Sequence, residues 1–427
     1  MVGNSAVKDL FQAIMRKHNA IQLVELDRPL PERDGKCAWG RDARVIHPNH
    51  VHLLPFPIPG TEILEDRLKP LLPGSDDRFI KSGISGSYGK GFLKEQAAAA
   101  LAFARSQRIP YRRMRSAIEG GNCFIFFDPQ ERLKAIIGYR SLLLTFIGLE
   151  DQNYFASHKE DLRALAASIT IPSRQALRAV GNMALYETQR KWEASYISMN
   201  SGGGSISSKE FKEQRKKYYS SLTGPVTEED GESFLHEARL WDAKCILAKR
   251  VIAADIRVPI ANIAFVPQTA FHIDMEMFVT PDGTRVGVDT SAYQRPLIKA
   301  LAQIGCKAVP LPGVFGPGIN FMNGKFVSTP KGTLFVTNGV KSEFALKRVE
   351  FQRAFQRAFP DLQIDFLDQS MQHILANHSG GIHCLTWEKP IYRTPRDIVA
   401  SYLADEPMPE TRLRAKLLEV IPSLAAD

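Results

Sequence analysis

Short apolar runs, typical of strands, alternate with helix-forming segments along much of this chain. Near the N-terminus, VIHPNHVHLLPFP contains short apolar runs broken by Pro and Asn. Residues 92–108 (FLKEQAAAALAFARSQR) are strong helix formers that end in basic residues, as helix C-termini prefer. The runs CFIFF and KAIIGY then flank the turn-forming segment DPQER, which predicts a β-hairpin.

The same alternation returns after residue 257. NIAFVPQ, HIDMEMFVT and RVGVD predict strands, AYQRPLIKALAQIG predicts a helix, and KAVPLPG predicts another strand. GINFMNGKFVSTPKGTLFVTNG predicts a second hairpin with NG as its turn, followed by a helix over 342–358 and a strand over 362–367. This pattern indicates an α/β fold.

The middle of the chain is different, because two long segments there have the periodicity of helices. Between them, a Gly/Ser-rich run predicts a flexible loop, followed by a basic stretch with interleaved tyrosines. Residues 201–225 are a candidate contact for a protein partner or a polyanion, although an exposed basic helix face explains the same pattern. We therefore predict five segments: a lead-in (1–36), a first catalytic part (37–150), a helical insertion (151–256), a second catalytic part (257–390) and a helical tail (391–427).

Composition narrows the class of protein only slightly. The 427 residues are 44% hydrophobic, which is enough for a large core, and the formal charge of +9 permits an anionic partner without requiring one. No stretch is long enough to span a membrane, and the N-terminus has no secretory apolar region. The chain has an odd number of scattered cysteines, namely Cys37, Cys123, Cys245, Cys306 and Cys384. These features predict a cytoplasmic protein with free thiols, or one delivered by a signal-less secretion route.

Four short motifs carry groups suited to catalysis: WGRD (39–42), EGGN (119–122), HID (272–274) and GGIHC (380–384). If HID lies on a strand, His272 and Asp274 share one face. Such a pair suits acid/base chemistry with a cation contact, or two metal ligands, or a polar pair satisfied at a strand end.

Cys384 is either a nucleophile or a small buried thiol. If its segment is extended, neighbouring side chains point to opposite faces, so His383 is poorly placed to activate it. The proton partner should then come from elsewhere, and His272 is the best candidate. Taken alone, Glu119 could belong to any turn.

Together, the motifs supply three carboxylates, one histidine as the candidate proton partner and one cysteine. Such a set suits a planar cation rich in N–H donors, because carboxylates bind it through paired hydrogen bonds. The central carbon of a guanidinium is a poor electrophile and needs a nucleophile such as a thiolate. A bound guanidinium supplies a positive charge that favours this thiolate.

These motifs resemble those of the guanidino-group modifying enzymes, which include agmatine, arginine and peptidylarginine deiminases and the amidinotransferases. WGRD resembles the W-x-R-D of agmatine deiminases, EGGN the E-G-G-D/N of deiminases, FHID their H-x-D, and GGIHCLT their terminal G-G-x-I-H-C-x-T. The resemblance covers residues 37–150 and 257–390. It implies the pentein fold, an α/β propeller of five ββαβ modules around a pseudo-fivefold axis, with the active site in a central channel.

The resemblance also implies a role for each matching residue. Cys384 is the nucleophile and His272 the general acid and base, while Asp42 and Asp274 grip the guanidinium. Glu119 supports the site. The remaining substrate-binding positions are Trp39, Arg41 and Asn122. No cofactor and no metal are implied. The agmatine-type RDxGP is RDARV here, which departs from the pattern of the enzymes that act on that small substrate.

We expect a hydrolase of a guanidino group, most simply a deiminase that forms a thiouronium on Cys384 and releases ammonia. Its substrate is arginine, an arginine derivative, agmatine or a protein arginine. An amidinotransferase would share the first half-reaction. Two alternatives come from other classes: a non-haem iron(II) oxygenase that uses His272, Asp274 and either His383 or His378, and a pentein-like binding protein without catalysis.

Overall fold

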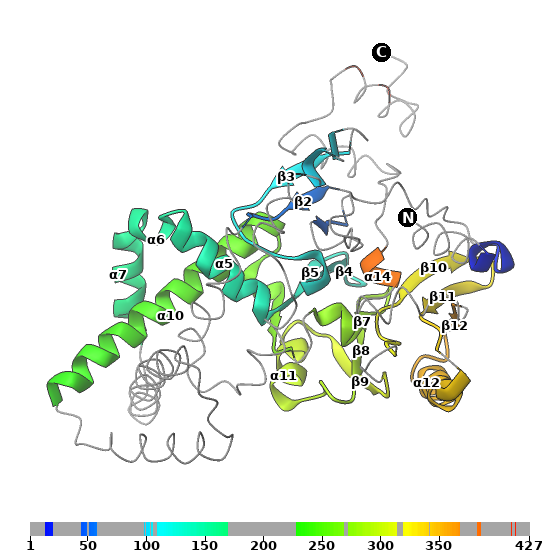
Figure 1. Ribbon diagram of the computed structural model, residues 1–427. Coiled ribbons are helices and arrows are strands. Elements are labelled where there is room, and N and C mark those ends of the chain that lie inside the picture. Colours follow the sequence, from blue (N-terminus) through cyan, green and yellow to red (C-terminus); the bar gives the residue numbers. More distant parts are fainter. Residues whose placement is uncertain are drawn as a thin grey trace, which may run out of the picture.

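The computed structural model describes about half of the chain (Figure 1). The described residues are 13–19, 44–48, 51–57, 98, 100–102, 104–105, 109–169, 228–268, 272–313, 319–340, 342–367, 382–385, 411 and 415.

Four three-stranded sheets share one topology. In each, the first two strands are antiparallel and the second and third are parallel. The sheets are β1–β2–β3 (Val45–Ile46, His52–Leu54, Tyr111–Arg113), β4–β5–β6 (Cys123–Phe127, Leu133–Gly138, Ile263–Val266), β7–β8–β9 (Met277–Val279, Arg285–Asp289, Lys307–Leu311) and β10–β11–β12 (Lys325–Thr329, Gly332–Thr337, Gln363–Phe366).

A parallel pair needs a crossover connection, and each sheet has a helical one between its second and third strands. Residues 98–105 are helical where described, α11 (Arg295–Gln303) precedes β9, and α12 (Ala345–Ala358) precedes β12. In the second sheet, the crossover between β5 and β6 contains the long helices of the middle of the chain, which are called the helical block below. The described chain therefore repeats a ββαβ unit four times, and the predicted α/β class is confirmed.

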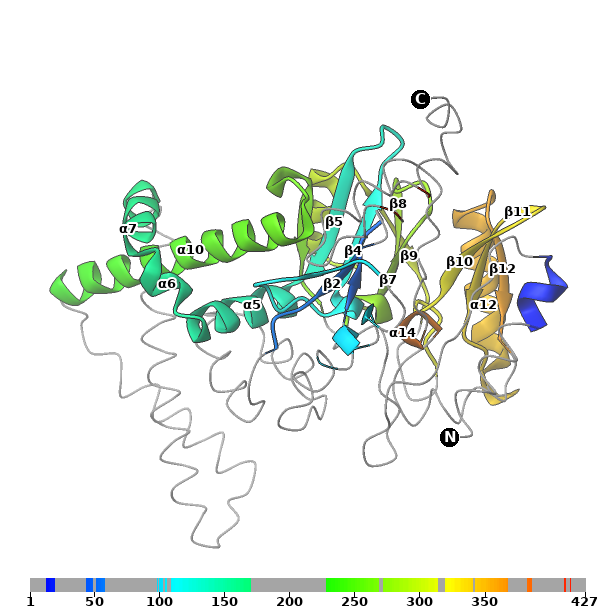
Figure 2. The ribbon, with the colours of Figure 1, turned by 90° about the horizontal axis from the view of Figure 1, so that it is seen from above.

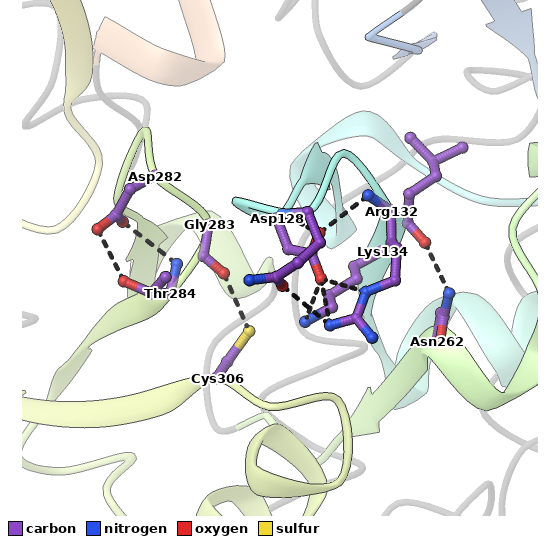
Figure 3. Close-up of polar contacts among 10 residues, drawn as sticks. Asp128, Arg132, Lys134, Asn262, Asp282, Gly283, Thr284 and Cys306 are labelled. Carbon is purple, nitrogen blue, oxygen red and sulfur yellow. Dashed lines mark hydrogen bonds and ion pairs between the residues drawn. The ribbon is translucent and has the colours of Figure 1, made fainter.

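The predicted hairpin around DPQER is confirmed by the pairing of Cys123 with Ile137 and of Phe127 with Leu133. Asp128 holds the turn, because its carboxylate accepts hydrogen bonds from the backbone N–H and the Nε of Arg132 (Figure 3). It also pairs with Lys134 at 3.0 Å. Local contacts of this kind let the turn be predicted from sequence.

The prediction that NG turns the second hairpin is wrong. The chain turns at residues 330–331, because Thr329 pairs with Gly332, whose φ of 111° is favoured by glycine. Asn323 is instead fully buried and donates to the main-chain carbonyl of Asp274. Asn323 therefore lies before the first strand of the hairpin and contacts a residue that is distant in sequence, rather than forming the turn.

The helical block consists of α5 (Tyr139–Asp151), α6 (Tyr154–Ser157), α7 (Lys159–Ser168) and α10 (Glu228–Ile256). It extends away from the sheets in both views (Figures 1 and 2). Helix α5 starts directly after β5, earlier than the insertion predicted over 151–256. Side chains of α5, α7 and α10 share one core cluster, and the C-terminal end of α10 enters the core around β5. None of the described helices is both long and apolar enough to cross a bilayer.

The last sheet packs on α12 through a cluster of phenylalanines. Phe355 is fully buried and stacks on Phe335 of β11, with ring centroids 5.3 Å apart. Phe278 of β7 contacts both rings, so the cluster joins the third and fourth units.

We predict that Phe355→Ala lowers the free energy of unfolding by about 3–5 kcal/mol, because it removes a fully buried ring from this cluster. Leu346→Ala on the same helix is the matched control, because Leu346 is 84% exposed. Urea unfolding of both variants checks the prediction, and equal losses would contradict the assignment of α12 as a core helix.

Candidate active site

Several residues of the candidate site lie in segments that join one ββαβ unit to the next or that follow the last strand. Glu119 lies between β3 and β4, and His272 and Asp274 lie between β6 and β7. Asn323 lies between β9 and β10, and His383 follows β12. These connecting segments contact one another through the side chains described below, so topology brings together residues that are distant in sequence.

Glu119 is the centre of one polar cluster. It immediately precedes the 3₁₀ turn η2 (Gly120–Asn122) and is 1% exposed. Its Oε2 accepts hydrogen bonds from Arg140 Nε and Asn122 Nδ2, each at 3.0 Å. The same oxygen lies 3.4 Å from His272 Nε2. One carboxylate oxygen thus lies close to nitrogen atoms from three segments.

The Glu119 carboxylate is ionised even though it is buried. Desolvation by itself would raise the pKa of Glu119, but the Arg140 guanidinium and the adjacent His272 lower the pKa from its ordinary value of 4.5 to about 2. The carboxylate is therefore ionised at neutral pH. A buried negative charge next to an imidazole can orient the ring.

Asn122 links this cluster to the HID segment. Its Oδ1 accepts hydrogen bonds from Gln268 Nε2 and from the backbone N–H of Ile273, while its Nδ2 bonds Glu119. Gln268 in turn accepts from the backbone N–H of Arg140. The resemblance assigns Asn122 to substrate binding, and the structure places it as a fully buried bridge between the two turns.

Gly121 gives a physical reason for the second glycine of EGGN. A Cβ atom at this position would lie 2.4 Å from Nδ1 of His272, which is far inside van der Waals contact. The imidazole therefore packs directly against the main chain of η2. Only glycine leaves room for the ring while Glu119 holds it from its Nε2 side.

The prediction that HID lies on a strand is wrong. His272 is the N-cap of the 3₁₀ turn η4 (Ile273–Met275), and β7 starts only at Met277. The two polar side chains consequently meet different partners. His272 faces Glu119, whereas Asp274 Oδ2 bonds Nδ1 of His383 at 2.8 Å.

The segment carrying Cys384 is also not extended. Its neighbouring side chains therefore do not alternate between two faces, as they would on a strand. Residues Ile382–Leu385 form one helical turn, α14, which lies between β4 and β10 (Figures 1 and 2). His383 points into the site, where its ring packs against Phe124 and its Nδ1 bonds Asp274. The main chain of Cys384 lies in this turn, and its side chain is outside the described part.

Several predicted residues lie outside the described part altogether. These are Trp39, Arg41, Asp42, His378 and residues 201–225. The site also contains residues that the sequence gave no reason to select, namely Arg140, Gln268 and Asn323. Arg140 follows an apolar strand as the second residue of a helix, and only the fold shows that it reaches Glu119.

The chemical capacity of the described cluster is that of a proton-transfer site. It holds an ionised carboxylate against one imidazole and a second carboxylate against another, with the Cys384 turn attached to the second pair. Within the described ranges, no group of three or more His, Cys, Asp or Glu side chains is arranged to hold a metal ion.

No protein-family model matches the chain, and no curated protein matches it. Among the solved structures that are similar to it are two of agmatine deiminases. One is an X-ray structure provisionally called an agmatine deiminase, at 12% identity and a TM-score of 0.30, with 70% of this chain and 62% of that one covered. The other is the agmatine deiminase of Enterococcus faecalis, at 11% identity and a TM-score of 0.33, with 72% and 67% covered. Because both TM-scores are low, function is inferred from the site residues themselves.

We predict that the stability advantage of the wild type over Glu119→Gln shrinks as the pH falls. A carboxylate whose pKa is depressed by folding stabilises the fold above its unfolded value of 4.5 and loses that contribution as the pH falls to about 2. The contribution is on the order of 3 kcal/mol. Urea unfolding across this pH range measures it. Glu160→Gln on the exposed face of α7 is the control, where only a small loss is expected.

We also predict that Gly121→Ala destabilises the protein by about 1–3 kcal/mol, because the added methyl group collides with His272. The cost should fall sharply in a His272→Ala background, where the ring is gone. A double-mutant cycle of unfolding free energies measures this coupling. Additive losses would show that the ring and the glycine do not contact each other.

Proposed function

We propose that this protein is a cysteine-dependent hydrolase of a guanidino group, a deiminase in which Cys384 is the nucleophile. The observation that carries the proposal is the 2.8 Å contact between His383 and Asp274. It brings the turn that contains Cys384 against the turn that contains His272, and Glu119 holds His272 from the other side. A thiol, an imidazole and an ionised carboxylate are the groups that nucleophilic substitution at a guanidinium carbon requires.

We further propose that the four ββαβ units belong to a pentein propeller with a fifth unit and a central channel. Two features support this arrangement. The units repeat one strand topology, and the site residues occupy the segments between units rather than scattered positions. Repetition of a unit around an axis would direct these equivalent segments toward the same centre.

The proposed reaction has two halves. The Cys384 thiolate attacks the guanidinium carbon, and the carbon–nitrogen bond breaks as His272 gives its proton to the departing ammonia. A thiouronium remains on Cys384. His272 then takes a proton from water, and the resulting hydroxide attacks the same carbon. The adduct collapses to the ureido product as its hydroxyl proton passes to the departing sulfur of Cys384, whose thiol later loses that proton to solvent. The Glu119 carboxylate stabilises the charged form of His272 between these steps.

Substrate recognition in this proposal depends on carboxylates. Asp42 and Asp274 accept hydrogen bonds from the guanidinium N–H groups, which also orients the carbon toward Cys384. Trp39 and Arg41 are proposed to line the same site. The substrate is arginine, an arginine derivative, agmatine or an arginine side chain of a protein. Residues 201–225 are proposed as the contact for a protein partner or polyanion.

Three alternative functions predict different experimental results. An amidinotransferase would pass the amidino group to an amine and form a new guanidine instead of ammonia. An iron oxygenase would lose activity with a chelator and regain it with ferrous ion. A binding protein would retain guanidino ligands unchanged. A carboxylate partner at one ring nitrogen of His272 suits acid/base catalysis and metal ligation alike, so chelation is the test that separates these two alternatives.

We predict that the protein releases ammonia from a guanidino compound or an arginine-containing peptide, and that Cys384→Ala abolishes the release without unfolding the chain. Cys245→Ala is the matched control. Burial raises the pKa of Cys245 to about 11, so this thiol is protonated at neutral pH and is not expected to act as a nucleophile.

The screen is read by ammonia release, by mass spectrometry of the product and by trapping of the thiouronium on Cys384. It is repeated after chelation, with ferrous ion added back. Full turnover by a folded Cys384→Ala variant would exclude the mechanism. Turnover restored by ferrous ion alone would favour the oxygenase.

A further inference from the structure

The turn that carries Cys384 is too short to hold its own shape. Helix α14 is a single turn of four residues, and an isolated turn is unfavourable because nucleation fixes several dihedral angles for one hydrogen bond. Its position must therefore come from contacts with other segments. Contacts from other described residues reach both the backbone of the turn and the side chain of His383.

The backbone contact comes from the end of β11. The backbone N–H of Ile382 donates to Oδ1 of Asn338 at 3.3 Å, which satisfies one of the N–H groups that a helix start leaves without an internal partner. Asn338 is itself fixed, because its Nδ2 donates to the main-chain carbonyl of Asn320 at 2.6 Å. All three residues are buried.

The side-chain contact comes from the HID turn. His383 Nδ1 donates to Oδ2 of Asp274, and the ring packs on Phe124 with centroids 5.6 Å apart. Asp274 is held in turn, because Asn323 Nδ2 donates to its main-chain carbonyl at 3.1 Å. His383 is thus linked through Asp274 and Asn323 to the same segment before β10 that contains Asn320.

We propose that His383 and Asn338 are positioning residues that hold the Cys384 turn in register with the HID turn, and that Asp274 therefore serves the thiol as well as the substrate. This inference rests on the proposed function for its catalytic meaning. The geometry separates the two histidines by role, since His272 is held by Glu119 for proton transfer while His383 acts through Asp274.

The role of His383 predicts an order among its variants. Asparagine places an N–H donor close to the position of Nδ1, so His383→Asn should keep part of the contact. Glutamine places its donor nearer the position of Nε2, and leucine has none. We expect kcat to fall about 10- to 100-fold in His383→Leu with a smaller change in KM, and His383→Asn to recover more activity than His383→Gln.

Alkylation of Cys384 by iodoacetamide tests the same geometry without any turnover. Peptide mass spectrometry resolves Cys384 from the other four cysteines. We expect the alkylation rate of Cys384 to change by about tenfold in His383→Leu and in Asn338→Leu, and to stay unchanged in His236→Asn, which alters an exposed histidine of α10. Asp274→Leu should produce the effect of His383→Leu, and the double variant should show no further change.

The two readouts distinguish failure of this inference from failure of the proposed function. Suppose that no guanidino compound is turned over, but that the alkylation rate of Cys384 changes in the variants of His383, Asn338 and Asp274 and not in His236→Asn. The positioning role then stands and the proposed reaction is excluded. If His383→Leu keeps both the wild-type alkylation rate and the wild-type kcat, the positioning role is overturned. If His383→Leu does not fold, His383→Asn against His383→Gln decides the matter by the same two measurements.

Discussion

A buried carboxylate that stays ionised is the feature on which the rest of this site depends. Glu119 is removed from water, and only the donors around it make that position tolerable: Arg140 supplies the compensating charge, and Asn122 and His272 supply polar contacts. A buried charge without such partners would cost several kcal/mol. The cluster therefore requires that α5, η2 and η4 all be in place, because each provides one of these donors.

This requirement explains how a fold of small sheets can define an active site. Neighbouring sheets share core clusters, but the segments between sheets have little regular structure of their own. Polar contacts join these segments, such as Asn122 with Ile273 and Asn323 with Asp274, and Asn338 at the end of β11 contacts Ile382 in the same way. Asparagine suits this work because its amide both donates and accepts. The polar network and the packing of the units thus depend on each other.

The proposed division of labour between the two histidines follows from the same network. His272 lies against the main chain of Gly121 with Glu119 at Nε2, whereas His383 lies against Phe124 with Asp274 at Nδ1. The residue next to Cys384 in sequence is thus tied to a carboxylate, and the proposed acid/base histidine comes from another unit. Adjacency in sequence says little about function here, because the helical turn and the distant partner together decide where each ring points.

The sequence by itself determined the features that depend on near neighbours. Alternation of apolar runs predicted the α/β class, and DPQER predicted its hairpin. The catalytic site of carboxylate, imidazole and thiol that EGGN, HID and GGIHC predict stays a prediction. The sequence-based prediction failed where a contact between distant residues decided the local structure. HID was predicted as part of a strand but lies at a 3₁₀ turn, and Asn323 was predicted in a hairpin turn but bonds the main chain of Asp274. Only the tertiary structure decided which groups pair. His383 and Asp274 are 109 residues apart, and their contact depends on how the units pack, which no local pattern encodes.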